Sequence, residues 1–360
     1  MPTSIAYFVS PHGFGHAARS AAVMEALHEL EPRIRFQVFT TVPAWFFHDS
    51  LHARFTLHPV TTDVGLVQKS SLEEDPAATV RALASFLPLR EERVRELAKS
   101  VRGLGCRLLV TDISPLGIAV ARAAEIPSVL VENFTWDWIY NAYTEAEPGL
   151  RPFLTPLCEL YASVGLHIQT EPCCRRLAGA PVVPPAARRF RGSVEETRRR
   201  LGLGDSRPMV LLTMGGVEWE YSFLDRLTRA QDLVFVVPGG AERSERRENL
   251  VLLPHRSPVY HPDLVAAADL VVGKAGYSTV AEAYRAGTRL ALVERPHFPE
   301  SAVLADFVRR HLPSLEIRAE DFPGAEWLDR LPDLLARGRP APRAENGADQ
   351  IASRLLRLLD

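Results

Sequence analysis

The chain has 360 residues, of which 46% are hydrophobic, and its formal net charge at pH 7 is −2. This length exceeds what one hydrophobic core usually organises, so we expect two domains. The near-neutral charge argues against a nucleic acid or an acidic membrane as partner, and without an apolar run of about 18 residues we expect no integral membrane segment.

The four cysteines, at positions 106, 158, 173 and 174, lack the spacing of a metal cluster or of a disulfide framework. The N-terminus begins directly with a strand-like run and carries no signal-peptide pattern. We therefore predict a cytoplasmic protein with reduced thiols. A redox or metal role for the adjacent Cys173 and Cys174 is the alternative.

Short apolar runs alternate with amphipathic stretches through the first half of the chain. The pattern predicts strands at residues 5–10, 35–40, 57–60, 107–112, 128–132 and 166–169. It predicts helices at residues 17–29, 76–99, 115–124, 136–146 and 152–162, the second of them kinked at Pro88. Repeated strand–helix units of this length indicate an α/β fold, a parallel sheet with helices on both faces.

The sequence changes character between residues 171 and 208, where a proline- and arginine-rich stretch without periodicity predicts the link between the domains. The alternation then restarts, with predicted strands at residues 209–213, 233–237, 249–253, 270–273 and 289–293 and helices at 194–201, 262–267 and 278–286. The chain closes as an amphipathic helix with Asn346 as its N-cap. We predict domains at residues 1–185 and 190–342, followed by a C-terminal helix within 343–360.

The turn between the first strand and the first helix, "SPHGFGH", contains two glycines and two histidines. It lacks the third glycine of a dinucleotide fingerprint, and no Walker A loop occurs in the sequence. We interpret Gly13 and Gly15 as places where the backbone approaches a ligand. His16 lies in the first helical turn, where the helix dipole disfavours the imidazolium, so His16 can act as a general base. The alternative is that His12 and His16 only hold the turn together.

A second turn whose residues could bind a ligand is "VVGKAGYSTVAEA". It joins a strand through glycines to a helix start that carries Ser278 and Thr279, where free backbone N–H groups and the helix dipole attract phosphate. Glu282 follows Thr279 by three residues. It can close a capping box with Thr279 and it can accept both hydroxyls of a ribose, and the two roles are not exclusive.

Two more features support an anion site in the second half. "TMGG", which follows the strand at residues 209–213, offers another group of backbone N–H donors. Lys274, one of only three lysines in the chain, adds positive charge unless it is a plain surface residue.

Taken together, these motifs resemble GT-B glycosyltransferases, among them the GlcNAc transferases that make the lipid-linked peptidoglycan precursor. A closer resemblance is to the N-terminal, glycosyltransferase-like half of plant-type L-arabinokinases. It is carried by "HGFGHAAR", "TTDVGLVQ", "TDISP", "ENFTWDWIY" and "GKAGYSTVAEA" and covers roughly residues 4–310. Those kinases continue into a sugar-kinase domain whose phosphate loop this sequence lacks, so we expect no kinase activity.

The resemblance implies a GT-B fold: two Rossmann-like, doubly wound parallel-sheet domains that face each other across a cleft, with the C-terminal helix packing back toward the first domain. It implies transfer of a sugar from a nucleoside diphosphate sugar, here a UDP-sugar, to a hydroxyl of a small-molecule or glycan acceptor, with His16 as the base. No cofactor and no metal are expected, and the protein is expected to be a monomer or a homodimer. A nucleotide-sugar epimerase or hydrolase, or a non-catalytic nucleotide-sugar sensor, are the alternatives.

The resemblance also assigns site residues. The donor nucleotide would bind at Gly215, Gly216, Leu253, His255, Lys274, Gly276, Ser278, Thr279 and Glu282. The rim around the donor sugar and the acceptor would consist of His12, Gly13, Gly15, Asp63, Gln68, Asp112, Asn133, Trp136, Asp137 and His297. For Trp136, burial in the core is the alternative to stacking on a sugar ring.

Overall fold

The computed structural model describes residues 3–70, 72–204, 206–216 and 219–359. It divides into two compact units. The N-terminal unit consists of Met1–Lys69, Glu74–Arg188 and Glu345–Asp360, and the C-terminal unit consists of Ser70–Glu73 and Arg189–Ala344. The chain therefore passes from the first unit to the second within the arginine-rich stretch and returns to the first unit for its final helix.

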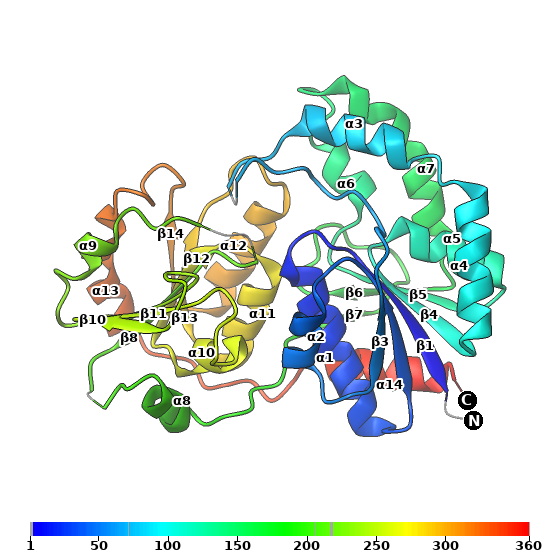
Figure 1. The fold of residues 1–360 in the computed structure, drawn as a ribbon. Coiled ribbons are helices and arrows are strands. Elements are labelled where there is room, and N and C mark those ends of the chain that lie inside the picture. Colours follow the sequence, from blue (N-terminus) through cyan, green and yellow to red (C-terminus); the bar gives the residue numbers. More distant parts are fainter. Residues whose placement is uncertain (1–2, 71, 205, 217–218, 360) are drawn as a thin grey trace. The chain divides into compact units, whose positions relative to one another are not determined.

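The N-terminal unit is built on a seven-stranded parallel sheet in the order β3-β2-β1-β4-β5-β6-β7 (Figure 1). Its strands are β1 (Ser4–Val9), β2 (Arg35–Phe39), β3 (Phe55–His58), β4 (Cys106–Asp112), β5 (Ser128–Glu132), β6 (Leu166–Thr170) and β7 (Val182–Val183). The order reverses between β1 and β4. In doubly wound sheets ligands bind at such a reversal, beyond the carboxyl ends of the strands; we call it the N-terminal switch point.

Helices cover both faces of this sheet because successive side chains of β1 point to opposite sides. Ile5, Tyr7 and Val9 pack with α1 (Phe14–Leu30), α2 (Ala44–Ser50) and α14 (Gly347–Arg357). Ala6 and Phe8 pack with α4 (Glu91–Gly103) and α5 (Pro115–Ala124). The unit also contains α3 (Pro76–Phe86), α6 (Trp136–Asn141), the 3₁₀-helix η1 (Pro148–Leu150) and α7 (Arg151–Ala162).

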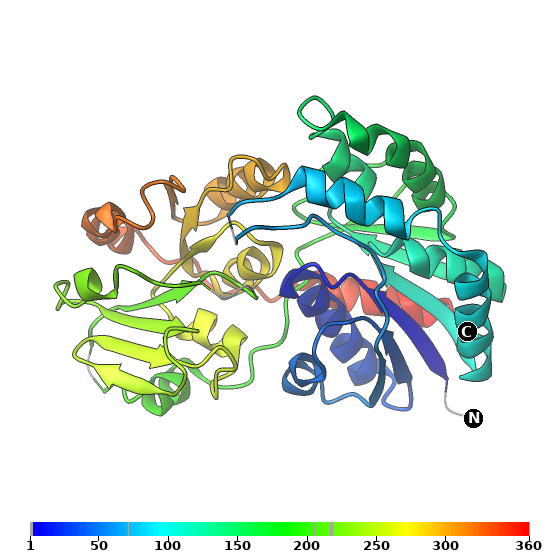
Figure 2. The same ribbon diagram turned by 45° about the horizontal axis from the view of Figure 1, so that its top comes forward.

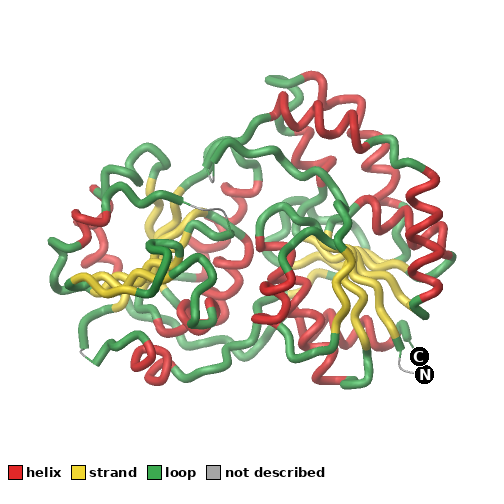
Figure 3. Tube along the Cα trace, viewed as in Figure 1, coloured by secondary structure: helices red, strands yellow, loops and turns green. Residues whose placement is uncertain are grey.

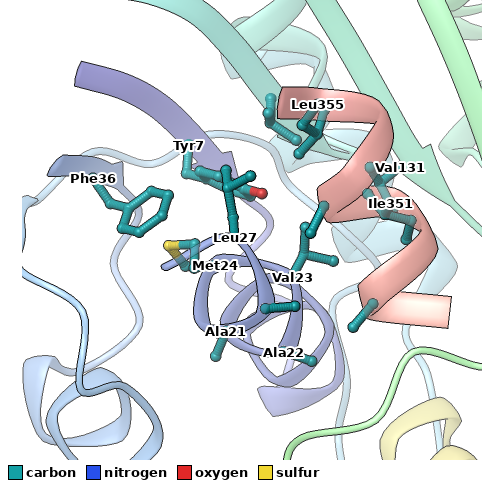
Figure 4. Packing of buried hydrophobic residues seen from close by; sticks show 14 of the residues in the cluster. Tyr7, Ala21, Ala22, Val23, Met24, Leu27, Phe36, Val131, Ile351 and Leu355 are labelled. Atoms are coloured by element: carbon teal, nitrogen blue, oxygen red, sulfur yellow. The ribbon is translucent and has the colours of Figure 1, made fainter. Parts of the chain in front are cut away.

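The C-terminal helix α14 completes the core of the N-terminal unit. Figure 4 shows Ile351 and Leu355 of α14 facing the same cluster as Val23 and Leu27 of α1, and all four side chains are buried. Asn346 caps α14 by accepting a hydrogen bond from the backbone N–H of Ala348 at 3.2 Å. The predicted cap and the predicted packing of this helix are confirmed.

The C-terminal unit contains a second seven-stranded sheet, in the order β10-β11-β9-β8-β12-β13-β14. Its strands are β8 (Met209–Thr213), β9 (Val234–Pro238), β10 (Glu245–Arg247), β11 (Leu250–Leu253), β12 (Leu270–Lys274), β13 (Arg289–Val293) and β14 (Ser314–Ile317). All neighbours pair in parallel except the edge strand β10, which is antiparallel to β11. The order reverses between β8 and β12, which we call the C-terminal switch point.

Helices flank the second sheet as well, as Figures 2 and 3 show. They are α8 (Val194–Arg200), α9 (Leu224–Leu227), α10 (His261–Ala267), α11 (Tyr277–Ala286), α12 (Glu300–His311), the 3₁₀-helix η2 (Glu326–Arg330) and α13 (Leu331–Ala336). One face of the sheet packs against an aromatic group that includes Phe223, Phe322 and Trp327. No helix in the described part of the chain is long and apolar enough to cross a lipid bilayer.

Two expected helices differ from the structure. The predicted helix at residues 76–99 is two helices, α3 and α4, because Pro88 lacks an N–H and ends the helical path instead of only bending it. The predicted helix at residues 136–146 is only α6, which ends at Asn141. Among the described elements, the helices α2, α9, α12 and α13, the 3₁₀-helices η1 and η2, and the strands β7, β10 and β14 were not predicted.

Candidate functional site

A histidine and an aspartate meet at the N-terminal switch point. After β1 the chain turns through Gly13, which caps α1 with a φ of +71°, a conformation that glycine adopts without strain. His16 is the third residue of α1, and Asp112 is the last residue of β4. His16 Nδ1 lies 2.8 Å from Asp112 Oδ1. Residues 96 positions apart in the chain thus form one hydrogen-bonded pair.

A buried arginine holds the carboxylate of this pair. Arg19 donates from Nε to Asp112 Oδ2 at 2.8 Å and from its terminal nitrogen to Oδ1 at 2.6 Å. Burial by itself would raise the pKa of Asp112, but the charge and hydrogen bonds of Arg19 hold that pKa below its ordinary value. An ionised carboxylate only accepts hydrogen bonds, so His16 Nδ1 is the donor in its contact with Asp112, and a terminal nitrogen of Arg19 also lies 3.3 Å from Nδ1.

Asp112 does not lie where it was predicted. It was expected on the acceptor rim, but its side chain is 2% exposed and contacts His16. It also accepts a hydrogen bond from Ser20 Oγ at 3.3 Å. Asp112 is therefore the orienting partner of the histidine.

Asp63 and Trp136 form a second buried pair next to His16. Trp136 Nε1 donates to Asp63 Oδ2 at 3.0 Å, and Ser10 Oγ donates to Oδ1 at 3.1 Å. Burial raises the pKa of Asp63 to about 6, against the opposing effect of the Trp136 hydrogen bond. Trp136 is 1% exposed and packs edge-on to the ring of His12. The core alternative for Trp136 is therefore the observed one, and the ring offers no face for stacking on a sugar.

The backbone of the opening turn faces open space. A Cβ atom placed on Gly13 or Gly15 would meet nothing within 4 Å, so the turn leaves room for another molecule. His12 instead packs inward: a Cβ on Gly65, where φ is +67°, would lie 2.7 Å from His12 Nδ1. Gln68 is half-buried and forms an isolated β-bridge with Glu74.

The C-terminal switch point combines a glycine, a lysine and a helix start. Gly215 follows β8 with a φ of +76°, and a Cβ there would lie 3.1 Å from Cε of Lys274, the last residue of β12. Helix α11 begins at Tyr277 with Gly276 as N-cap and without a side-chain cap. The capping-box alternative is therefore wrong. Ser278 and Thr279 lie in the first turn, where backbone N–H groups lack helical partners.

The electrostatics of this switch point favour an anion. Burial, together with repulsion from Arg295, lowers the pKa of Lys274 to about 7, and the nearby Glu300 only partly opposes the shift. Arg295 is itself buried, with its guanidinium 3.7 Å from the ring centre of Phe298. Two cationic side chains are thus held close together, with Glu300 as a nearby acidic group. A bound anion would relieve their repulsion and restore the charge of Lys274.

Glu282 lies on the next turn of α11 and is 1% exposed. His261 Nδ1 lies 3.2 Å from Glu282 Oε2, and His261 Nε2 lies 3.3 Å from Thr213 Oγ1. The carboxylate is thereby tied to the end of β8. Of the remaining residues predicted for the donor nucleotide, Leu253 accepts a backbone hydrogen bond from Gly239, Gly216 is half-buried, and His255 is exposed. His297, which was predicted for the sugar rim, is also exposed.

Several residues of these two sites were not predicted from the sequence, among them Ser10, Arg19, Ser20, His261 and Arg295. Arg19 had a usable signal, because it follows His16 by three positions and so lies on the same face of α1. The contacts of the others depend on strand pairing that no local pattern reveals.

The adjacent cysteines have no sign of redox chemistry. Cys173 donates from its thiol to the carbonyl of Thr170 at 3.4 Å, and burial raises its thiol pKa to about 12. A thiol that stays protonated is a poor nucleophile and a poor metal ligand. Within residues 3–359, leaving aside the positions not described, no group of three or more His, Cys, Asp or Glu side chains is arranged to hold a metal ion.

Comparison with known proteins gives one sequence relative and many structural ones. No protein-family model matches the chain. An L-arabinokinase from Arabidopsis thaliana is 28% identical over 331 residues, which are 91% of this chain and 31% of the kinase. The chain thus spans about a third of the length of that relative.

Three solved structures illustrate the structural similarity. The spinosyn forosaminyltransferase SpnP has a TM-score of 0.63 at 15% identity, with all of both chains covered. A UDP-glucosyltransferase from Polygonum tinctorium has a TM-score of 0.62 at 15% identity, covering 99% of this chain and 98% of that one. MurG from Acinetobacter baumannii has a TM-score of 0.58 at 14% identity, covering 99% and 100%. The chain has the GT-B fold of these glycosyltransferases.

Proposed function

We propose that this protein is a glycosyltransferase that moves a sugar from a nucleoside diphosphate sugar to a hydroxyl group of an acceptor, with His16 as the general base. One observation carries the proposal: His16 Nδ1 is bound to the ionised Asp112 at 2.8 Å, at the carboxyl ends of the strands. A histidine held in this tautomer has a basic Nε2 and a stabilised imidazolium.

The proposed reaction is a displacement at the anomeric carbon of the donor sugar. The acceptor hydroxyl gives its proton to His16 Nε2 while its oxygen forms a bond to the anomeric carbon. The bond between that carbon and the diphosphate oxygen breaks, and the nucleoside diphosphate leaves with the electron pair. Proton transfer of this kind contributes about 10² to 10⁴-fold to the rate.

The C-terminal switch point would bind the diphosphate. Lys274 and Arg295 supply positive charge, and Gly215 and the first turn of α11 supply backbone N–H donors. Glu282 would accept the ribose hydroxyls. These groups neutralise the leaving group without a metal ion, so we expect turnover to persist in the presence of a chelator.

The named relatives support this donor class. The Polygonum tinctorium protein is a UDP-glucosyltransferase, and another solved neighbour, from Phytolacca americana, is described with a UDP-2-fluoro-glucose. We propose a UDP-sugar as donor on this basis.

The test compares donor binding and transfer in His16→Ala. We expect Kd for UDP, measured by calorimetry, to stay within about twofold, because His16 belongs to the other unit. We expect turnover of a UDP-sugar with a mixed panel of hydroxyl acceptors to fall at least about a hundredfold. The matched control is His52→Ala, which removes another histidine bound to a carboxylate, Glu25, at 2.6 Å. It should keep full turnover.

Other outcomes separate the alternatives. Donor consumption without any acceptor would indicate an epimerase or a hydrolase. Saturable binding of UDP-sugars with no turnover would indicate a sensor. Equal turnover in wild type and His16→Ala would exclude His16 as the base.

A further inference from the structure

In the described part of the chain, Asp63 is a buried carboxylate without an arginine or lysine partner. It lies in the loop after β3 and is 2% exposed. Its two oxygens accept hydrogen bonds from neutral groups, Ser10 Oγ at 3.1 Å and Trp136 Nε1 at 3.0 Å. A charge that is removed from water without an ionic partner costs stability, which makes Asp63 a candidate for a functional role.

The backbone beside Asp63 is fixed at the N-terminal switch point. Thr62 Oγ1 donates to the carbonyl of Val9, the last residue of β1, at 2.8 Å. Ser114 Oγ donates to the carbonyl of Thr62 at 2.9 Å. The loop after β3 is therefore held against the ends of β1 and β4, the two strands that lead to the opening turn and to Asp112.

The hydrogen-bond partners of Asp63 belong to the segments that surround His16. Ser10 directly follows β1, and its Oγ accepts a hydrogen bond from the backbone N–H of His12 at 3.3 Å. The ring of Trp136 packs on the ring of His16, with their centres 6.2 Å apart. Asp63 thus links the turn that carries His16 to an aromatic ring that packs against it.

The two carboxylates near His16 differ in the positive charge that faces them. Asp112 is paired with Arg19, and a terminal nitrogen of Arg19 also lies 3.3 Å from His16 Nδ1. The guanidinium therefore offsets much of the attraction between Asp112 and an imidazolium. Among the described residues, the cationic group that acts on Asp63 is His16 itself. The other titratable groups that face Asp63, from β4, α6 and α7, are negative or neutral: Asp112, Tyr140 and Tyr161.

We propose that Asp63 is a positioning residue for the proposed base, and that its negative charge stabilises the imidazolium that forms when His16 takes the proton of the acceptor hydroxyl. The proton moves to His16 Nε2, while Asp63 keeps its two hydrogen bonds and exchanges no proton. Burial raises the pKa of Asp63 to about 6, so the carboxylate is mostly ionised at pH 7 and loses its charge in more acidic solution. This inference rests on the proposed transferase function.

The test separates the charge of Asp63 from its hydrogen bonds. Asp63→Asn keeps an oxygen for Trp136 Nε1 and a polar group for Ser10 Oγ, but it is uncharged. Asp63→Ala removes the charge and both hydrogen bonds. The matched control is Glu25→Gln, which neutralises another buried carboxylate of the same unit that contacts a histidine, His52, at 2.6 Å.

Two properties are measured in each protein. NMR titration of the histidine rings, with the His16 signal assigned from His16→Ala, gives the protonation midpoint of His16 without any substrate. Turnover of a UDP-sugar gives kcat, and calorimetry gives Kd for UDP. In Asp63→Asn we expect the His16 midpoint to move to lower pH and kcat to fall at least about tenfold, because the imidazolium has lost a stabilising charge. Kd for UDP should stay within about twofold, and Glu25→Gln should match wild type.

The same interaction can be measured from Asp63, which decides the question if circular dichroism shows that Asp63→Asn fails to fold. Since attraction between two charges is reciprocal, removal of His16 should raise the pKa of Asp63 above its value of about 6. The indole N–H signal of Trp136, assigned from Trp136→Phe, reports the ionisation of Asp63 through their hydrogen bond. The midpoint of this signal should therefore move to higher pH in His16→Ala.

Three results would overturn the inference. The first is that Asp63→Asn behaves as wild type while Asp63→Ala loses turnover, which would mean that only the hydrogen bonds matter. The second is an equal change in Glu25→Gln, and the third is an unchanged Trp136 midpoint in His16→Ala. Both titrations are made without substrate, so they separate this inference from the proposed function. A protein with both shifts that transfers no sugar refutes the transferase and not the interaction of Asp63 with His16.

Discussion

The two switch points occupy equivalent places in two similar sheets, yet they differ in how their charges are compensated. At the N-terminal switch point, the charge of Asp112 is balanced within the fold by Arg19, with His16 and Ser20 completing its hydrogen bonds. At the C-terminal switch point, Lys274 and Arg295 repel each other, and Lys274 has a lowered pKa as a result of this repulsion and of burial. This difference supports the two roles that we propose: orientation of a base at the first switch point and binding of an anion at the second.

The largest expected effect concerns stability. Arg19→Met leaves Asp112 as an uncompensated buried charge, so we expect the free energy of unfolding to fall by about 3–5 kcal/mol. Lys274→Met removes a charge that the fold does not compensate, so stability should stay within about 1 kcal/mol or increase. Urea unfolding followed by circular dichroism measures both.

A double variant checks the reason for the first effect. Arg19→Met combined with Asp112→Leu removes both charges, and most of the lost stability should return, because apolar pairs often replace buried ion pairs at little cost. If the double variant were as unstable as Arg19→Met, lost packing and not the unpaired charge would explain the loss.

The next largest effect is expected in the affinity for the donor nucleotide. Glu282→Gln keeps the shape of the side chain but replaces a charged acceptor of the ribose hydroxyls with a neutral one. Hydrogen bonds to charged groups contribute about 1.5–3 kcal/mol, so we expect Kd for UDP to rise about tenfold to a hundredfold. Calorimetry with UDP and with inorganic diphosphate measures the difference. Only UDP should be affected, and an equal change for diphosphate would contradict a ribose contact.

The smallest effect is a pH dependence of donor binding. The pKa of Lys274 is about 7 in the free protein, below its ordinary value, and a bound diphosphate would raise it again. UDP affinity should therefore decrease by up to about tenfold per pH unit as the pH rises above 7, with proton uptake on binding. Calorimetry in buffers of different ionisation enthalpy detects this uptake. In Lys274→Met both the slope and the uptake should disappear.

The contribution of Lys274 to the stability of the folded protein should increase with pH, whereas its contribution to UDP affinity should decrease. Between pH 7 and its ordinary pKa, Lys274 binds a proton in the unfolded chain but not in the folded one. The unfolded state then holds more protons, so the contribution of Lys274 to the free energy of unfolding increases with pH across this interval. Subtracting the pH profile of Lys274→Met from that of wild type isolates this contribution.

The sequence predicted the strand–helix alternation well because most of the β-strands are short apolar runs next to stretches with helical periodicity, although the edge strand β10, with the sequence Glu-Arg-Arg, is not. β5, β8 and β13 have the predicted bounds, and so does α5. The stretch 76–99 was predicted as one kinked helix, whereas Pro88, which lacks an N–H, separates two helices there. Short helices such as α2 were missed because they add few residues to any periodic pattern.

The residues of the candidate site, like the elements of the fold, were predicted only in part. Gly13, His16, Lys274 and Ser278 were singled out from the sequence because each lies in, or directly beside, a turn that joins a strand to the following helix, a place that local patterns reveal. The roles of Asp112 and Trp136 were not, because both depend on partners more than 70 positions away.

By itself, therefore, the sequence determined the two-domain α/β architecture and the turns where ligands would bind, since hydrophobic periodicity and glycine placement are local properties. Only the tertiary structure decided which aspartate lies against His16, the residue that the sequence had already suggested as the base. The physical reason is that strand order, which no local pattern encodes, brings α1 beside β4 and so places Arg19 and His16 on the same carboxylate.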